Sequence, residues 1–459
     1  MAKAYFVGQR LVKDAAPAPA DRVAFAWKEP DAPLRRTTLF AEHQKRTKKI
    51  VPFAGWEMPV WYASTMEEHR AVRQAAALFD VSHMGTFEIS GEHATDFLDF
   101  ATTNYAKWSR DGESFYSYLL DPDGDIIDDI MVYRLSRTRY LMVVNAANEA
   151  KDWAWLNLVN DGKAVTDRDV PQRRVLIPAT LRDLKDPRWG AERRVDVAFQ
   201  GPKSRDVLLK LLDPAERQRL KAMKRTGCGE YTLAGLPVVI ARTGYTGESI
   251  GFEIFVHPDR APELWNAILA AGQPHGATIA GLGARDSLRT EAGLPLYGHE
   301  LAGPHNISPL GAGFGSYVKL HKPFFIGKAG LLKQEAARDK VIVRFAVPGK
   351  GAKPVRPGDP VASARGAFIG VVTSSVVDGE GRQVGLAYVQ LKAAKPGPVA
   401  IFPLPGEKDR DEIVPPTKLG EKARTLLPVQ AEIVERFPKR ADSLDMVRTE
   451  GQIALEMID

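Results

Sequence analysis

The sequence has almost no cysteine. Cys228 is the one cysteine among 459 residues, which excludes an intramolecular disulfide and any zinc or iron–sulfur site built from several cysteines. No apolar run reaches the ~20 residues that cross a bilayer, and the N-terminus lacks the compact apolar core of a signal peptide. We therefore expect a cytoplasmic protein that does not enter a membrane.

Positive and negative charges also nearly balance in this sequence. Lys and Arg number 63 and Asp and Glu 57, a net charge of +6, and the charges are interspersed. Because nucleic-acid binders often carry a basic arm or stripe, we expect no nucleic-acid partner. The small surplus is compatible with an anionic ligand or an acidic partner protein, or it only keeps the protein soluble.

Several common catalytic signatures are missing. The chain has no Gly-x-Gly-x-x-Gly after a strand, no Gly-x-x-x-x-Gly-Lys-Ser/Thr and no Gly-x-Ser-x-Gly. His299 and His305 have the wrong spacing for a helical zinc pair, and Pro304 stands between them. We expect neither a nucleotide site of these types nor a metal.

The sequence that is present predicts several regions. Apolar residues make up 44% and charged residues 26%, which is typical of globular proteins and allows a sizeable core. We expect an N-terminal arm over 1–36, a mixed region over 37–336 with two interleaved subdomains and a surface excursion over 161–195, a barrel over 337–437, and a tail over 438–459. The barrel prediction depends on short β-branched runs separated by Gly-Pro turns.

Local patterns predict individual elements. Ser64-x-x-Glu67 and Thr65-x-x-Glu68 both match a capping box, so a helix should follow and run to Phe79. Further elements are expected as a strand over 84–90, a helix over 92–101, an antiparallel meander over 115–120, 126–135 and 140–144, and helices over 263–271 and 283–288.

Asp128 and Asp129 lie within an apolar strand pattern, Ile126 to Tyr133. Side chains alternate along a strand, so one of the two carboxylates must point into an apolar environment. Such groups are costly and cluster at functional sites. Alternatively, both lie at the end of a hairpin, where water or turn amides satisfy them.

Two other charged segments are candidates for a site. Arg285 and Arg289 are spaced i, i+4, which places two guanidinium groups on one helix face as a clamp for an anion or, alternatively, on an ordinary solvated face. After the turn at 244–248, Glu253 stands between Phe252 and Ile254. It is either an embedded carboxylate or an edge-strand residue facing water.

Five ordered motifs resemble one family, the aminomethyltransferases (T-proteins) of the glycine cleavage system. They are Phe53-Ala-Gly-Trp-Glu-Met-Pro-Val60, Leu78-Phe-Asp-Val-Ser-His-Met-Gly85, Ile126-Ile-Asp-Asp129, Arg242-Thr-Gly-Tyr-Thr-Gly-Glu248 and Gly283-Ala-Arg-Asp-Ser-Leu-Arg289. The resemblance covers roughly residues 35 to 437. It implies an α+β fold, mixed and largely antiparallel around a central folate-binding channel, followed by a C-terminal β-barrel.

The resemblance also implies an activity. In this family a lipoylated H-protein presents an aminomethyl group, and the enzyme releases ammonia and passes the one-carbon unit to tetrahydrofolate, which gives 5,10-methylenetetrahydrofolate. The family's essential aspartate matches Asp129. Its folate-contacting positions match Met84, Tyr116, Asn145, Tyr245, Glu253, Arg285 and Tyr388.

Other functions remain open at this point. The fold class also hosts tetrahydrofolate-dependent demethylases that act on a small methylated compound without H-protein. Flavoenzymes with a similar domain carry an FAD-binding domain before it, and about 36 residues are too few for one. A folate-binding relative without enzyme activity uses a cysteine-containing motif where this chain has Arg242 to Gly247.

Overall fold

The computed structural model describes residues 22–404 and 427–437. The predicted tail over 438–459 and the first part of the predicted arm, 1–21, lie outside these residues. The described chain divides into two compact units: residues up to 244, 250–285 and 295–341 form the first, and 245–249, 286–294 and the chain from 342 form the second. The domain bounds expected from the sequence stay predictions.

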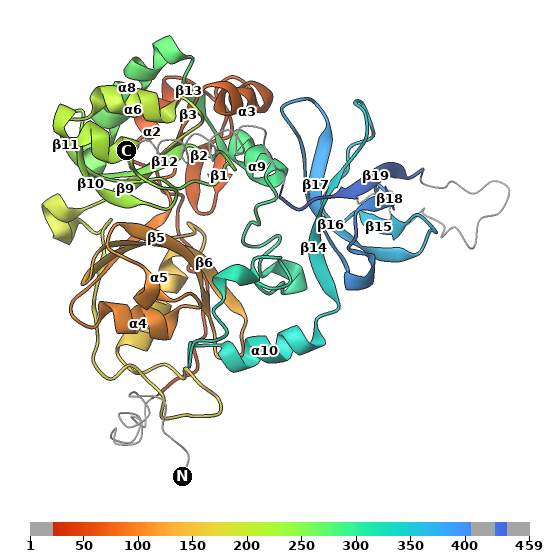
Figure 1. Cartoon of the computed structure of the whole chain (residues 1–459), viewed down its shortest axis with the longest axis horizontal. Helices are drawn as coiled ribbons and strands as arrows, with labels where there is room; N and C mark the ends of the chain where they lie inside the picture. The colour runs from red at the N-terminus through yellow and green to blue at the C-terminus, as the bar shows by residue number, and fades with distance from the viewer. Residues whose placement is uncertain (1–21, 405–426, 438–459) are drawn as a thin grey trace, which may run out of the picture. The chain divides into compact units, whose positions relative to one another are not determined.

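The first unit contains two large sheets (Figure 1). A five-stranded sheet has the order β5-β6-β7-β4-β8, with β5 (Glu113–Leu120), β6 (Ile126–Ser136), β7 (Arg139–Val144), β4 (Gly85–Ser90) and β8 (Thr180–Asp183). A six-stranded sheet has the order β10-β11-β12-β9-β3-β13, with β10 (Cys228–Leu233), β11 (Leu236–Ala241), β12 (Gly251–Val256), β9 (Val195–Gln200), β3 (Ala77–Asp80) and β13 (Thr278–Ala280). A two-stranded sheet joins β1 (Ile50–Phe53) and β2 (Trp56–Pro59).

Helices cover these sheets or connect their strands. They are α2 (Phe40–Gln44), α3 (Thr65–Gln74), α4 (Ala94–Ala101), α5 (Glu149–Asn160), α6 (Ser204–Leu211), α7 (Arg217–Lys221), α8 (Ala261–Gly272), α9 (Leu282–Glu291) and α10 (Lys328–Ala337). One face of the five-stranded sheet packs on α4 and α5 through Phe97, Leu98, Trp155 and Leu156. Within the described ranges, no helix is long and apolar enough to cross a membrane.

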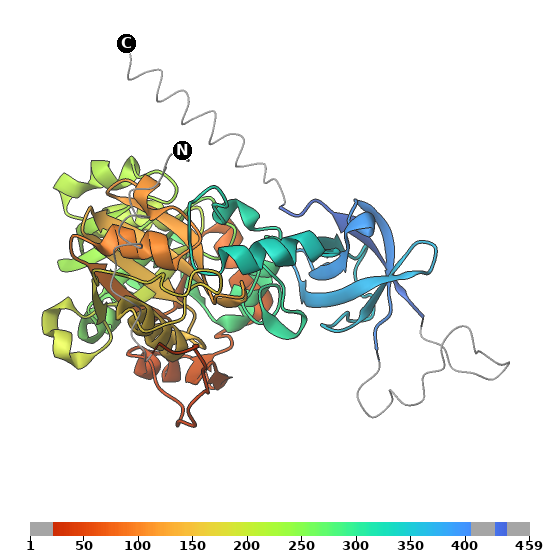
Figure 2. The same ribbon diagram turned by 90° about the horizontal axis from the view of Figure 1, so that it is seen from below.

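The second unit contains the predicted barrel. Six strands close in the order β14-β17-β16-β15-β18-β19 and are drawn in blue in Figure 2. Their bounds are β14 (Lys340–Ala346), β15 (Pro360–Ser363), β16 (Phe368–Val377), β17 (Gln383–Gln390), β18 (Gly397–Ile401) and β19 (Val429–Val434). The α+β fold with largely antiparallel strands and a C-terminal β-barrel is therefore confirmed, with β3–β13 a parallel exception.

Two local predictions around residue 70 are wrong. The helix ends at Gln74, and Ala77–Asp80 is a strand whose four residues are all buried. This strand lies between β9 and β13 in the six-stranded sheet, and its one charged side chain, Asp80, bonds to His43. The second capping box does not form either. Ser64 alone caps the helix, while the Glu68 carboxylate accepts backbone N–H groups of Tyr62, Ala63 and Gly281.

The antiparallel meander over 113–144 is confirmed. Tyr118 pairs with Asp129 between β5 and β6, and Met131 pairs with Val143 between β6 and β7. The excursion over 161–195 is mostly irregular but contributes β8, which pairs with β4. The described part of the arm packs on it, since Val23 exchanges backbone hydrogen bonds with Lys163 and Val165.

Candidate active site

The two aspartates of β6 occupy different environments. Asp128 lies on the same strand face as Ile130 and Val132, which pack in the core beneath α4 and α5, and its side chain is 0% exposed. Asp129 lies on the opposite strand face, with Met131 and Tyr133, and is half-buried. The alternative of two solvated aspartates is therefore wrong, and Asp128 is the carboxylate that enters the apolar core.

Two side chains hold the Asp129 carboxylate in place. Tyr116, on β5, donates its hydroxyl proton to Asp129 Oδ2 at 2.7 Å. Asn145, directly after β7, donates from Nδ2 to Asp129 Oδ1 at 2.9 Å and to Asp128 Oδ1 at 2.8 Å. One amide group thus joins both carboxylates.

The surroundings of Asp129 make it a weaker acid than usual. Burial, and then the charge of Asp128, raise its pKa to about 7, against the lowering effect of the bonds from Tyr116 and Asn145. A carboxyl group that titrates near neutral pH suits proton transfer in both directions. Asp129 can therefore stabilise positive charge when ionised and take up a proton.

Glu253 faces the same space from the other sheet. It lies on β12, which pairs with β11 and β9 on its two sides, so the edge-strand alternative is wrong. Tyr133 on β6 donates its hydroxyl proton to Glu253 Oε2 at 2.6 Å, and Thr243 donates to the same oxygen. Burial and the charge of Glu253 raise the pKa of Tyr133 well above its usual value, so the phenol stays a donor.

Arg285 lies at the start of α9 and belongs to the same unit. Its guanidinium group contacts His83 Nε2 at 3.4 Å and the sulfur of Met84 at 3.9 Å. Burial and the charge of Arg285 lower the pKa of His83 to about 3, which leaves a neutral ring able to accept this bond. Met84 packs against the apolar cluster formed by Tyr133, Cys228 and Phe255 between the two sheets.

The first unit therefore brings most of the predicted site residues into one region. Those residues are Met84, Tyr116, Asp129, Asn145, Glu253 and Arg285. Tyr245 and Tyr388 belong to the second unit, and their part in the site stays a prediction.

Arg289 belongs to the second unit, whereas Arg285 belongs to the first. The side chain of Arg289 is 1% exposed and bonds to Asp286 at 2.8 Å and to Ser374 at 2.9 Å within the second unit. The alternative of an ordinary solvated helix face is therefore wrong for Arg289, and the clamp formed with Arg285 stays a prediction. The buried guanidinium group of Arg289 forms an ion pair with the half-exposed carboxylate of Asp286 in the unit that contains the barrel.

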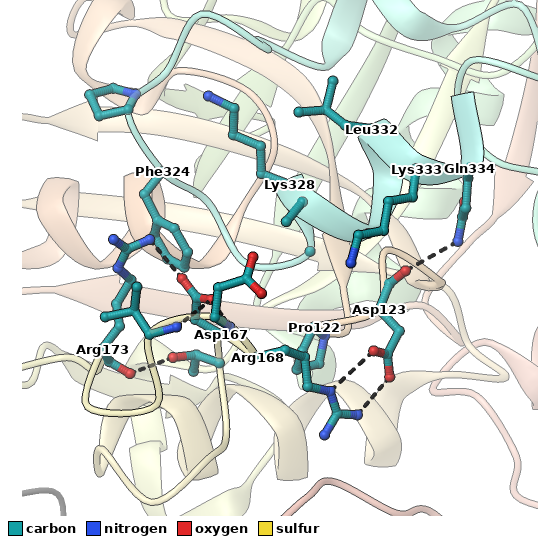
Figure 3. A pocket seen from close by; sticks show the side chains of 17 residues that line it. Pro122, Asp123, Asp167, Arg168, Arg173, Phe324, Lys328, Leu332, Lys333 and Gln334 are labelled. Carbon is teal, nitrogen blue, oxygen red and sulfur yellow. Dashed lines mark hydrogen bonds and ion pairs between the residues drawn. The ribbon is translucent and has the colours of Figure 1, made fainter. Parts of the chain in front are cut away.

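A separate pocket of about 430 Å³ opens where the segment 166–173 meets 323–334 (Figure 3). None of the predicted site residues lines it. Its two arginines are engaged with neighbouring acids: Arg168 bonds to Asp123 at 2.6 Å, and Arg173 bonds to Asp167 at 2.7 Å. We take the space between the sheets as the candidate active site, because the predicted residues converge there and the pKa of Asp129 is raised to about 7.

Sequence reasoning missed several neighbours of the site. Tyr133 could have been found, since it shares a strand face with Asp129 four residues earlier. Asn148 donates to Asp128 Oδ1 at 2.6 Å, and Asp152, one helical turn later, is also buried. Neither carried a signal in the sequence, because their relation to Asp128 depends on how α5 packs on the sheet.

Comparison with known proteins agrees with this geometry. The family model described as "GCVT N-terminal domain" matches residues 39–322. An aminomethyltransferase of Symbiobacterium thermophilum is 40% identical over 360 residues, which cover 78% of this chain and 89% of that protein. One of Caldanaerobacter subterraneus subsp. tengcongensis is 40% identical over 366 residues, 79% of this chain and 90% of that protein.

A solved structure is similar as well. The crystal structure of glycine cleavage system aminomethyltransferase T from Bartonella henselae is 27% identical, with a TM-score of 0.69, and the match covers 89% of this chain and all of that one. The family match spans more than half of the chain. The chain therefore belongs to the GCVT family, the family of the glycine cleavage aminomethyltransferases.

Proposed function

We propose that this protein is an aminomethyltransferase of glycine cleavage. It takes the one-carbon unit from the aminomethyl-lipoyl arm of an H-protein, releases ammonia and forms 5,10-methylenetetrahydrofolate. The observation that carries the proposal is the Asp129 carboxylate, which is held by Tyr116 and Asn145 and has a pKa raised to about 7. The relatives' names support the reaction, and nothing in them favours the demethylase alternative.

The site residues fit a reduced folate in their chemistry. Glu253 offers a carboxylate that can accept two N–H groups, and a pterin ring presents such groups side by side. Arg285 offers a cation near Met84, suited to an anionic tail or a polar ring edge. We propose that Met84, Tyr116, Asn145, Tyr245, Glu253, Arg285 and Tyr388 bind the folate.

Tetrahydrofolate, when bound, supplies the nitrogen nucleophiles that accept the one-carbon unit. Asp129 stabilises the positive charge that develops on the transferred carbon and accepts a proton as the new bonds form. Tyr116 and Asn145 fix the orientation of the carboxylate, so that little reorganisation is needed during the reaction. The same carboxyl group can return its proton to departing ammonia.

Product formation by the purified protein tests the proposal. With tetrahydrofolate and aminomethylated H-protein, we expect ammonia and 5,10-methylenetetrahydrofolate in equal amounts, and neither product when H-protein is left out. Transfer of an intact methyl group from a small methylated compound to tetrahydrofolate, which gives 5-methyltetrahydrofolate without H-protein, would instead identify a demethylase.

A further inference from the structure

Asp152 is a buried acid, and in the part of the chain that the structure describes no hydrogen-bond donor stabilises the ionised form of its carboxyl group. It lies in the first turn of α5, and its backbone N–H donates to Asn148 O at 2.8 Å. The side chain is 0% exposed. Among the described residues, no N–H or O–H group donates to either of its carboxyl oxygens.

The charged groups that act most strongly on Asp152 come from two elements. From β6, Asp128 lies within hydrogen-bonding contact and Asp129 is close enough to act through its charge. From α5 itself, Lys151 is near, but its Nζ donates to the hydroxyl of Tyr297 at 2.9 Å. Asp152 therefore faces more negative than positive charge.

Asp128 differs from Asp152 in having donors. Its Oδ2 accepts the backbone N–H of Asn145 at 2.8 Å, and its Oδ1 accepts side-chain N–H groups of Asn145 at 2.8 Å and Asn148 at 2.6 Å. Three N–H bonds stabilise an ionised carboxylate. Of the two touching acids, Asp128 is the one built to be charged and Asp152 the one built to be neutral.

We propose that Asp152 is a protonated acid that donates its proton to Asp128, and that this bond makes Asp152 a positioning residue for Asp129. The first part stands on the burial and contacts of Asp152 alone, and the second rests on the proposed function. The pKa of Asp152 agrees with the assignment, since burial and the charge of Asp128 raise it well above its usual range.

The shared proton affects Asp129 through charge. Asp128 would otherwise place a full negative charge next to Asp129, and like charges at this range raise a carboxyl pKa strongly. A proton held between Asp152 and Asp128 weakens that repulsion. Asp129 then stays sufficiently ionised at neutral pH to stabilise a cation.

Infrared spectroscopy tests the first part without any assay of activity. At about pH 9, far above the ordinary pKa of a carboxyl group, the parent protein should show the carbonyl stretch of a buried protonated acid. The parent-minus-Asp152→Asn difference spectrum should contain this band, and it removes the background from Asp196, another buried acid with a raised pKa. A difference spectrum without the band would overturn the proposal.

The pH profile of kcat tests the second part. Asp152→Leu removes the proton donor, so the acid limb of the profile should move to higher pH by about one unit. At pH values below the limb, kcat should then be roughly tenfold lower than in the parent. Asp152→Asn keeps an N–H donor and should return the limb toward its parent position. Asp161→Asn, an exposed carboxyl at the end of α5, serves as the control.

The outcomes separate the proposal from the proposed function. A limb that stays in place or moves downward in a folded Asp152→Leu variant would contradict the positioning role. If that variant does not fold, the limb of Asp152→Asn decides: a shift of a full unit would contradict the role of the donor. A positive infrared result in a protein without H-protein-dependent activity would leave the protonation standing and reject the function.

Discussion

The side chain of Asn145 joins Asp128 and Asp129 through a single nitrogen. Asn145 Nδ2 lies 2.8 Å from Asp128 Oδ1 and 2.9 Å from Asp129 Oδ1, although the two aspartates are consecutive in a strand. The buried charge of Asp128 therefore acts on Asp129 over a short distance in a region of low dielectric constant. Burial of Asp129, and then this charge, raise its pKa to about 7, against the lowering effect of the bond from Asn145.

Tyr116→Phe should move the acid limb of the pH profile of kcat to higher pH. The hydroxyl of Tyr116 stabilises the ionised form of Asp129, and a hydrogen bond to a charged group contributes about 1.5–3 kcal/mol. Its loss should raise the pKa of Asp129 and shift the limb by about one unit. Tyr140→Phe is a matched control in the same sheet, since its hydroxyl bonds to Thr95 at 2.6 Å. Equal profiles for Tyr116→Phe and the parent would show that this bond does not matter.

Glu253→Gln should weaken folate binding more than it slows the reaction. The variant keeps the size of the side chain but loses the charge, and charge-assisted hydrogen bonds are about twice as strong as neutral ones. We expect the Kd for tetrahydrofolate, measured by calorimetry, to rise about tenfold or more. Glu230→Gln, an exposed carboxylate paired with Arg139, should leave that Kd unchanged. A selective fall in kcat at constant Kd would reassign Glu253 to catalysis.

Asp129→Asn should stabilise the folded protein at alkaline pH. The folded-state pKa of Asp129 is raised to about 7, so the folded protein binds this proton more tightly than the unfolded chain does. Stability is therefore lost as pH rises from the ordinary carboxyl value toward 7, and the uncharged variant avoids this loss. Thermal unfolding should give a gain on the order of 1 kcal/mol at about pH 8 that shrinks at about pH 5. A variant that is less stable at both pH values would contradict the raised pKa.

Added salt should raise the KM for H-protein. Carrier docking is transient, and transient interfaces depend on charge for encounter and register. Raising the ionic strength from about 0.05 to 0.5 M shortens the screening length from roughly 14 to 4 Å, so the KM for H-protein should rise several-fold, while the Kd for tetrahydrofolate changes less. A KM that does not respond to salt would reject the electrostatic contribution of the +6 net charge.

The sequence predicted those features that depend on local pattern. The meander over 113–144 follows from alternation and a strong turn, and the barrel follows from short strands between Gly-Pro turns. Ala77 to Phe79 were assigned to a helix, because a short apolar run fits either structure until its neighbours are known. Only pairing with β9 and β13 makes this run a strand.

The site was predictable in its residue types but not in its connections. Asp128 and Asp129 stood out as carboxylates in an apolar strand, and the resemblance assigned the essential role to the second of them. That Asn145 joins them and that Asp152 lies against Asp128 depends on the packing of α5 on the sheet. Such contacts link residues about 20 positions apart, and no local pattern encodes them.

The rate of H-protein-dependent ammonia release by Asp129→Asn tests the role of this carboxylate most directly. The variant keeps the size of the side chain and can still bond to Tyr116 or Asn145, but it can neither stabilise positive charge nor take up a proton. We expect kcat to fall by at least about 100-fold, with a much smaller change in folate binding, while Asp123→Asn, an exposed aspartate of the same hairpin, retains the parent rate. Turnover of Asp129→Asn near the parent rate, with Asp128→Asn folded but inactive, would contradict the assignment of Asp129 as the catalytic residue.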